Sequence, residues 1–321
     1  MPVDQLAPSH LLDPEVLRRW QDAWDRDPDA TLFHHPLWTE ASVPASVHPI
    51  FVEAGRSVLA ARITPDGVLR FLTDANVTDV AAPIGDHADA PGLVAALADL
   101  DGWSSADLDG FIGTGWLTPM SEAAAARGWT TSIEQVATSP WIALTGTFDE
   151  YLAGIESKQR HEIRRKGRRL ERELAPWQTR LTDAATLTDD VDAFVAMHRL
   201  AAGDKGSFMT DAHEALFRRV AAVMLEHGWL RINWVETIEG VRLAAVWSFS
   251  VRGRWLVWNS AFDPAHRELS AGMIAMAEAI RLACEERCSA FDLLRGDEGY
   301  KYRFGAVDEP VHALRITRGT S

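Results

Sequence analysis

The sequence predicts an α/β (α+β) fold of two tandem domains, each with a mixed, mainly antiparallel, twisted sheet flanked by helices. Two observations lead to this prediction. The chain has 321 residues, 47% of them hydrophobic and 24% charged, which is enough for two hydrophobic cores. Strand-like runs joined by tight turns occur once in each half, and helical patterns accompany both sets. We expect one domain over residues 1–145 and a second over residues 146–321.

The N-terminal half is predicted to begin with a helix from Pro14 to Trp24, because Asp13 is a favourable cap and proline suits the first helical position. Glycine-containing turns then separate three strand-like runs. The elements expected after the first helix are strands at Val47–Val52, Ser57–Ile63 and Val68–Leu72, a helix at Leu93–Leu100, a strand at Ala106–Ile112, a helix at Ser121–Arg127, and strands near Thr130–Val136 and Pro140–Leu144.

The C-terminal half repeats this order with a long first helix, Phe148–Leu174, capped by Thr147 and carrying a narrow apolar stripe. Alternating and continuous apolar runs then indicate a second meander. The elements expected after the long helix are helices at Asp189–Ala201 and Asp211–His227, strands at Leu230–Thr237, Val241–Val251 and Trp255–Phe262, a helix at Ala271–Glu286, and strands at Ala290–Leu294 and Val311–Ile316.

Composition excludes several classes of protein. No run approaches the ~20 apolar residues of a membrane span and the N-terminus lacks the pattern of a signal peptide, so we expect a cytoplasmic protein. Cys284 and Cys288 are the only cysteines, and we expect them to be reduced structural thiols. The sequence has no metal-ligand spacing, so we expect no metal. A net charge of −14 argues against binding to DNA.

A strand, a polar turn and a helix follow one another over Phe262–Gly272. Free backbone N–H groups at a helix start bind pyrophosphate, and the small residues Ser270, Ala271 and Gly272 let a ligand come close. An ordinary helix start with Ser270 as its cap is the alternative. The pattern Arg267-x-x-Ser270-x-Gly272 resembles the coenzyme A loop, Gln/Arg-x-x-Gly-x-Gly/Ala, of the GNAT acyltransferase superfamily, with serine in place of the first glycine.

Two further segments resemble the cellulose-biosynthesis (CelD)-like family of that superfamily. The stretch Phe291–Ala306 is similar to the family's D-F/L-x-R-G-D-x-x-Y-K-x-R-W/F-G segment, and Ser157–Lys166 to its S-K-x-R-x-x-I/L-R-R-x helix. This resemblance covers residues 140–321 well and implies a GNAT domain in the second half, preceded by a degenerate GNAT-like domain. It implies acetyl-coenzyme A or another acyl-coenzyme A as co-substrate, bound through Arg267, Ser270, Ala271 and Gly272.

Acyl transfer to an amine needs a neutral nucleophile, and hence a general base, and a proton for the leaving sulfur. Asp292, at a strand end, and Asp297 or Glu298 just after it are the candidate bases, and Tyr300 or Tyr302 suits the proton donor. Asp292, Tyr300 and Lys301 are the expected catalytic residues. We expect these residues to line the acceptor side of the cleft. An ion-pair network that anchors the last strand is the alternative for Asp292, Arg295, Asp297 and Lys301.

The segment Lys158–Arg172 holds eight Lys or Arg residues against two Glu, within a chain of net charge −14. Like charges at i,i+4 repel, which favours contact with an anionic partner over a merely solvated face. The residues expected to bind substrate are Lys158, Arg160, Arg164, Arg295, Asp297 and Glu298.

The sequence therefore predicts an acyl-coenzyme A-dependent N-acyltransferase, expected to transfer acetyl to an amine on a small molecule or a polymer. Two alternatives stay open. Fem-type peptidyltransferases pair two such domains and use aminoacyl-tRNA. Under this alternative the predicted helix that carries the basic segment Lys158–Arg172 binds tRNA. A non-catalytic protein that keeps the GNAT fold for binding is the other; the many ionisable groups between Asp292 and Arg303 argue against it.

Overall fold

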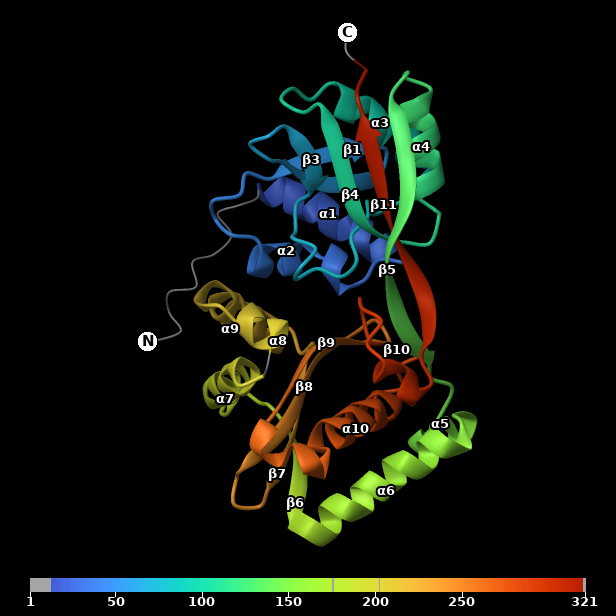
Figure 1. Cartoon of the computed structure of the whole chain (residues 1–321). Coiled ribbons are helices and arrows are strands. Elements are labelled where there is room, and N and C mark those ends of the chain that lie inside the picture. Colours follow the sequence, from blue (N-terminus) through green and yellow to red (C-terminus); the bar gives the residue numbers. More distant parts are fainter. Residues whose placement is uncertain (1–12, 175, 202, 320–321) are drawn as a thin grey trace. The chain divides into compact units, whose positions relative to one another are not determined.

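The computed structural model describes residues 13–174, 176–201 and 203–319, and the chain divides into two compact units (Figure 1). Unit 1 is the part up to Thr138 together with the stretch from Glu309 onward, and unit 2 is Ser139–Asp308. This division differs from the expected one in its treatment of the C-terminus. The last strand belongs to unit 1, because β11 (Val307–Thr317) pairs antiparallel with β4 (Ser105–Ile112).

The sheet of unit 1 starts with an antiparallel meander of β1 (Ile50–Ala54), β2 (Ser57–Ile63) and β3 (Val68–Phe71). Strand β4 lies parallel to β3, and their pairing is confined to Val68↔Ser105 and Leu69↔Ala106. The N-terminal part of β5 (Thr130–Ala143) follows β11 in the strand order.

Helices cover both faces of the β1–β2 hairpin. Alternate residues of β2 point to opposite faces, and Leu59 and Ala61 join the core under α3 (Ala90–Ala98) and α4 (Leu117–Ala125). Val58 and Ala60 line a small space beside Trp20 of α1 (Pro14–Arg26), which packs against α2 (Pro36–Ser42). The strand's alternation therefore fixes which helix lies on which face.

The sheet of unit 2 has the order β5-β10-β9-β8-β7-β6. Its strands after β5 are β6 (Trp177–Leu181), β7 (Leu230–Thr237), β8 (Arg242–Val251), β9 (Arg254–Phe262) and β10 (Ala290–Asp292). Strand β10 runs parallel to β9, and their pairing ends at Asp292↔Leu256. Strand β9 continues to Phe262 against β8, with a bulge at Trp258. The two strands therefore diverge beyond Leu256.

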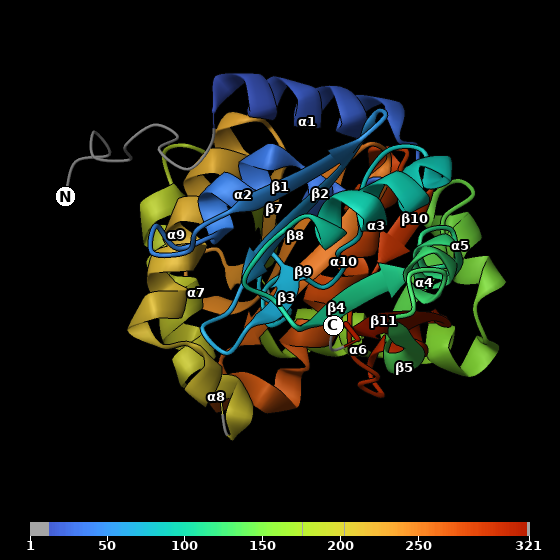
Figure 2. The same cartoon turned by 90° about the horizontal axis from the view of Figure 1, so that it is seen from above.

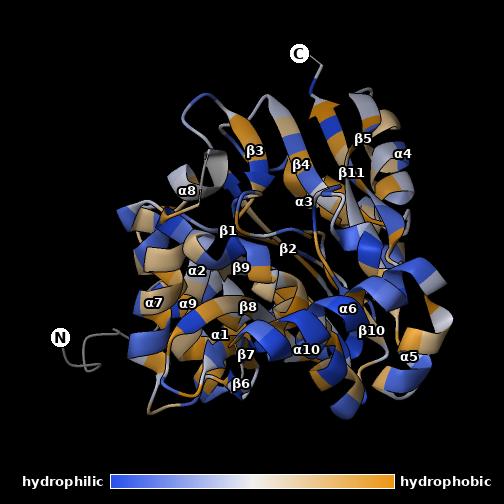
Figure 3. Cartoon of the chain, turned by 60° about the horizontal axis from the view of Figure 1, so that its bottom comes forward, coloured by the Kyte–Doolittle hydropathy of each residue, from blue (hydrophilic) through white to orange (hydrophobic). Residues whose placement is uncertain are grey.

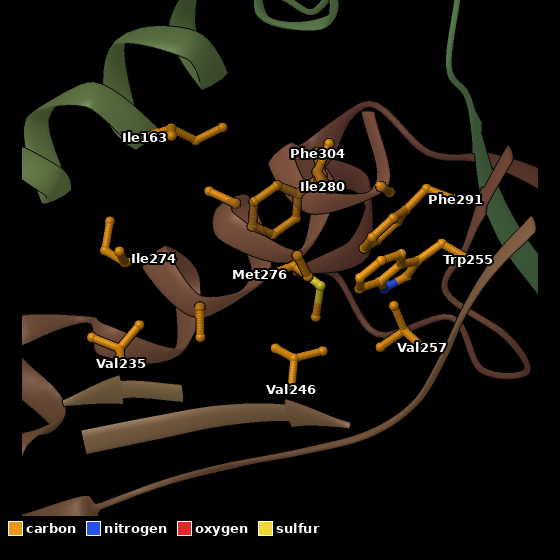
Figure 4. Close-up of a cluster of buried hydrophobic side chains, with 14 of the residues drawn as sticks. Ile163, Val235, Val246, Trp255, Val257, Ile274, Met276, Ile280, Phe291 and Phe304 are labelled. Carbon is orange, nitrogen blue, oxygen red and sulfur yellow. The ribbon is translucent and has the colours of Figure 1, made fainter. Parts of the chain in front are cut away.

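Helix α10 (Ala271–Glu285) covers one face of this sheet, and α6 (Ser157–Leu174) packs on α10. Figure 4 shows Ile163 of α6 on one side of α10 and Val235 and Val246 of the sheet on the other. The other face carries α7 (Leu187–Arg199), α8 (Asp204–Phe208) and α9 (Asp211–Glu226), which gather on one side of the unit (Figure 2). The α/β fold class, with mainly antiparallel sheets, is confirmed.

Several element predictions were wrong in detail. The expected helix Phe148–Leu174 is two helices, α5 (Phe148–Gly154) and α6, because the backbone at Ile155 is extended. The two strands expected between Thr130 and Leu144 are the single strand β5, in which the Pro140 carbonyl accepts from Leu293 N. Strand β6 and helix α2 were not predicted. Over the residues that the model describes, none of the helices combines the length and apolar character needed to cross a membrane.

Candidate functional site

A pocket of about 310 Å³ in unit 2 lies where β9 ends and α10 begins. It opens beside the divergence of β9 and β10, so the topology of the sheet produces it. Helix α6 and the turn after β10 supply the remaining walls. The lining residues are Lys166, Leu243, Ser260, Ala261, Phe262, Asp263, His266, Arg267, Ser270, Ala271, Gly272, Met273, Met276, Tyr300, Arg303 and Phe304.

The start of α10 faces this pocket. Ser270 adopts the left-handed conformation at φ 57°, where the superfamily loop has its first glycine. In the described part of the chain, no side chain caps the first turn, which leaves the N–H groups of Ala271 and Gly272 directed at the pocket end of the helix. A Cβ added at Gly272 would lie 3.7 Å from Phe262 Cβ, so the helix start and the strand end are close. The helix dipole favours an anion here.

Lys166 brings a positive charge to this helix start. Its Nζ donates a hydrogen bond of 2.6 Å to Ser270 Oγ and lies 3.5 Å from the carboxylate of Glu162 on the preceding turn. The side chain is mostly buried, with 16% exposed. An ammonium held in this position adds to the field of the helix N-terminus.

Two arginines complete the cationic rim. Arg267 and Arg303 line the pocket and are exposed. Within the described residues, neither guanidinium makes a side-chain hydrogen bond or ion pair, so both are available to a ligand. His266 also lines the pocket, with Nδ1 at 2.8 Å from Asp263 Oδ2. Free guanidinium forks are suited to phosphate oxygens.

The rest of the wall is apolar. Leu243 and Phe262 come from β8 and β9, Met273 and Met276 from α10, and Phe304 from the turn that follows β10. An apolar floor beside a cationic rim suits a ligand that joins a phosphate group to an extended, less polar arm.

Tyr300 is the sequence-predicted catalytic residue that the pocket contains. Burial against the wall, and secondarily the charge of Glu298, raise the pKa of its hydroxyl above the ordinary value. The hydroxyl is therefore protonated at neutral pH and can donate a hydrogen bond or a proton to a ligand.

Asp292 lies outside the pocket lining, in a buried network. Its Oδ1 accepts from Leu294 N at 2.9 Å and from Ser139 Oγ at 3.3 Å, and its Oδ2 lies 3.2 Å from Arg254 Nη2. Burial raises the pKa of this carboxyl against the opposing effect of Arg254. These contacts hold the backbone that follows β10.

Lys301 is also buried and donates to three carbonyl oxygens, those of Leu294 at 2.9 Å and of Arg295 and Gly296 at 3.0 Å. Its ammonium pairs in addition with Glu298 at 3.0 Å. Leu294, between Asp292 and Lys301, has φ 58°, a strained conformation for a bulky residue. Asp292 and Lys301 therefore hold a strained turn that leads the chain to Tyr300.

The predicted substrate-binding residues do not gather at the pocket. Arg160 Nη1 donates to the carbonyl oxygens of Leu152, Ala153 and Ile155, at the end of α5. Lys158 and Arg164 are exposed on α6 outside the lining, as are Asp297 and Glu298 on the turn, while Arg295 is half-buried outside it. Arg160 thus caps a helix, and α6 contributes Lys166 instead.

Sequence reasoning missed Lys166 and His266 as pocket residues. A signal for Lys166 was present, because it lies three residues after Ile163 and four before Leu170, on the stripe that turns inward. A lysine within an apolar stripe indicates a buried polar contact. His266 had no comparable signal, whereas Arg303 belongs to the segment Phe291–Ala306 that resembles the family motif.

Comparison with protein families assigns the class. Residues 157–302 match the family model described as "Acetyltransferase (GNAT) domain", and this range contains the whole pocket apart from Arg303 and Phe304. The chain therefore contains a GNAT domain over residues 157–302, which supports an acyltransferase. No curated protein gives a significant sequence match.

Solved structures share the fold of the whole chain. FemX aligns with a TM-score of 0.66 at 10% identity, over 93% of this chain and 95% of FemX. The C-terminal domain of a putative lysylphosphatidylglycerol synthetase from Agrobacterium fabrum aligns at 0.62 and 15% identity, over 95% and 92%. A tandem GNAT protein from the clavulanic acid biosynthesis pathway aligns at 0.51 and 11% identity, over 96% and 97%. The tandem GNAT-like architecture is therefore confirmed.

Proposed function

We propose that this chain transfers an acyl group from a coenzyme A thioester to an amine, with unit 2 binding the donor. The observation that carries the proposal is the uncapped start of α10 facing a pocket that also contains Lys166, Arg267 and Arg303. Backbone N–H groups, an ammonium and two guanidiniums together suit a pyrophosphate. The diverging strands beyond Leu256 leave the edge of β9 for the donor's amide-containing arm.

We assign to Tyr300 the role of hydrogen-bond donor to the sulfur of the leaving coenzyme A. The amine nitrogen bonds to the thioester carbonyl carbon as the carbonyl–sulfur bond breaks, and the protonated phenol at the pocket wall hydrogen-bonds to the leaving thiolate. The proton that the nitrogen loses passes through solvent to the sulfur, so the products are the amide and the free thiol. Asp292 and Lys301 contribute indirectly, because they hold the turn at Leu294 that positions Tyr300. Tyr300→Phe is expected to keep donor affinity and to lower turnover about 10²- to 10⁴-fold.

Unit 1 is proposed to be degenerate as a donor domain and to contribute to acceptor binding. Its equivalent helix, α3, begins at Ala90 after Asp89 and has Pro91, which lacks an N–H group, as its second residue. The Asp89 carboxylate accepts from Arg56 N and Ser57 Oγ, and a Cβ at Gly92 would lie 2.8 Å from Ala54 Cβ. The turn between β1 and β2 therefore occupies the place that an anion needs.

An aminoacyl-tRNA donor is the second candidate, supported by the outward face of α6. Lys158, Arg164 and Arg168 are exposed there, and Figure 3 shows α6 as largely hydrophilic. Fem-type peptidyltransferases, which the chain resembles, use aminoacyl-tRNA. The pocket favours coenzyme A because its cations lie around a partly apolar hollow and not along a helix face.

A thermal-shift panel with coenzyme A, acetyl-coenzyme A and bulk tRNA separates these candidates. Coenzyme A and its acetyl ester should raise the melting temperature, because a ligand that binds only the folded state stabilises it. Stabilisation by tRNA without an effect of either thiol compound would support the second candidate. Release of free thiol from acetyl-coenzyme A, measured with a panel of amines, then identifies the acceptor class.

A further inference from the structure

Unit 1 contains a charged cavity of about 170 Å³ at the place where β3 and β4 separate. The pairing of these parallel strands ends at Leu69↔Ala106, and the cavity lies beyond it. Arg62 of β2 and Asn76 also lie in its wall. The complete lining is Arg62, Arg70, Phe71, Thr73, Asp74, Ala75, Asn76, Asp107 and Asp109.

Two arginines stand directly opposite each other in this wall, since Arg62 pairs with Arg70 in the antiparallel register of β2 and β3. Like charges in opposite positions destabilise a sheet. Arg62 Nε is buried and finds no acceptor among the described residues, and its Nη2 lies 3.8 Å from Asp74 Oδ2, beyond hydrogen-bond distance. The guanidinium of Arg62 therefore has unused donors.

Three acids, Asp74, Asp107 and Asp109, line the cavity beside this pair, and Asp109 already has a partner. Asp107 lies 3.3 Å from Arg70 Nη2, but it also accepts from Arg315 Nη1 at 2.8 Å. Asp74 uses Oδ1 for the backbone and side-chain nitrogens of Asn76, and half of its side chain is exposed. One side of the cavity thus offers guanidinium donors, and the other offers the Asp74 carboxylate, whose Oδ2 has, within the described ranges, only the long 3.8 Å contact with Arg62 Nη2.

We propose that this cavity binds a small zwitterion, a free α-amino acid, with its carboxylate on Arg62 and Arg70 and its ammonium on Asp74. A guanidinium fork matches a carboxylate, and its unmet donors make the bound state favourable. A volume of about 170 Å³ admits a small molecule and excludes a nucleotide. The inference concerns unit 1 alone and does not depend on the donor assignment in unit 2.

Calorimetric titration of the full chain with the free L-amino acids tests the proposal. At least one amino acid should bind saturably. Its amide, which lacks the carboxylate, and its N-acetyl derivative, which lacks the ammonium, should bind at least about tenfold more weakly, because each loses a charge-assisted hydrogen bond. The absence of binding by every amino acid, or equal binding of the two derivatives, would overturn it.

Variants test the location. Arg62→Gln should weaken binding of that amino acid at least about tenfold, and Arg62→Lys, which keeps the charge without the fork, should weaken it to a lesser degree. Arg127→Gln is the matched control, since Arg127 is exposed in unit 1 outside the cavity. Unchanged affinity in Arg62→Lys and Arg62→Gln, with folding intact by circular dichroism, would contradict the assignment to this cavity.

Discussion

Lys166 Nζ donates a hydrogen bond of 2.6 Å to Ser270 Oγ, which joins the middle of α6 to the first residue before α10. The two residues are 104 positions apart in the chain. In the superfamily loop a glycine stands at the position of Ser270. Here the serine hydroxyl fixes a lysine beside the uncapped N–H groups of the helix start, so α6 becomes part of the proposed donor pocket.

Lys166→Met should therefore weaken coenzyme A binding about 10- to 100-fold, the effect of losing one charge-assisted contact of about 1.5–3 kcal/mol. Calorimetric titration with coenzyme A measures this. Arg164→Met is the matched control, because Arg164 is exposed on the same helix and outside the pocket. Equal losses in both variants would mean that the helix acts by its overall charge.

Arg160 is predicted to act on stability rather than on binding. Arg160→Met removes the donor to three carbonyl oxygens at the end of α5 and should lower the free energy of unfolding by about 1–2 kcal/mol. Arg164→Met, four residues later, should change it by less than about 0.5 kcal/mol. Urea denaturation of the two variants makes the comparison. Equal unfolding midpoints would count against the capping role.

Lys301→Met should destabilise the chain, contrary to what a purely catalytic residue would do. It leaves three carbonyl oxygens and the strained Leu294 turn without their ammonium, at a cost of about 2–4 kcal/mol. For a unit of this size the melting temperature should fall by roughly 5–15 °C. Tyr302→Phe, which loses one exposed hydrogen bond to Asp308, should melt close to the parent. A parent-like melting temperature for Lys301→Met would refute the positioning role.

Acid sensitivity should arise in unit 1 from His34. Burial lowers the pKa of His34 to about 4, from 6.5 in the unfolded chain. The unfolded state therefore binds the proton first, and stability is lost as pH falls from about 6.5 to about 4, by roughly 3 kcal/mol in total. His34→Gln cannot take up the proton and should show a correspondingly smaller loss. Denaturant titrations at pH 7, 5.5 and 4 measure the difference; parallel losses in both proteins would exclude His34 as the cause.

Local signals in the sequence account for most of the fold. Caps such as Asp13 and Thr147, turn glycines and apolar periodicity located the helices and strands of both units. The break between α5 and α6 had no local signal, since it depends on Arg160 and on the packing of Ile155 near Gly305. The return of β11 to unit 1 is a long-range pairing that local pattern does not encode.

The candidate site also has a part that local sequence predicts and a part that depends on tertiary packing. Arg267, Ser270, Ala271 and Gly272 form a contiguous motif, and all four line the pocket. Asp292 and Lys301 have residue types that serve both chemistry and structure, and only their partners show which role their geometry favours. Lys166 depends on how α6 packs on α10, which single-sequence patterns do not specify.

Coenzyme A binding to Gly272→Glu, compared with Gly272→Ala and the parent, is the measurement that tests the donor site most directly. Gly272 has space for a methyl group, because an added Cβ meets Phe262 at an ordinary 3.7 Å, so the alanine variant should bind coenzyme A as the parent does. The glutamate variant places a carboxylate at the helix start and should show no saturable binding in calorimetric titration while remaining folded. Parent-like affinity in Gly272→Glu, or no binding of coenzyme A by the parent, would contradict the account.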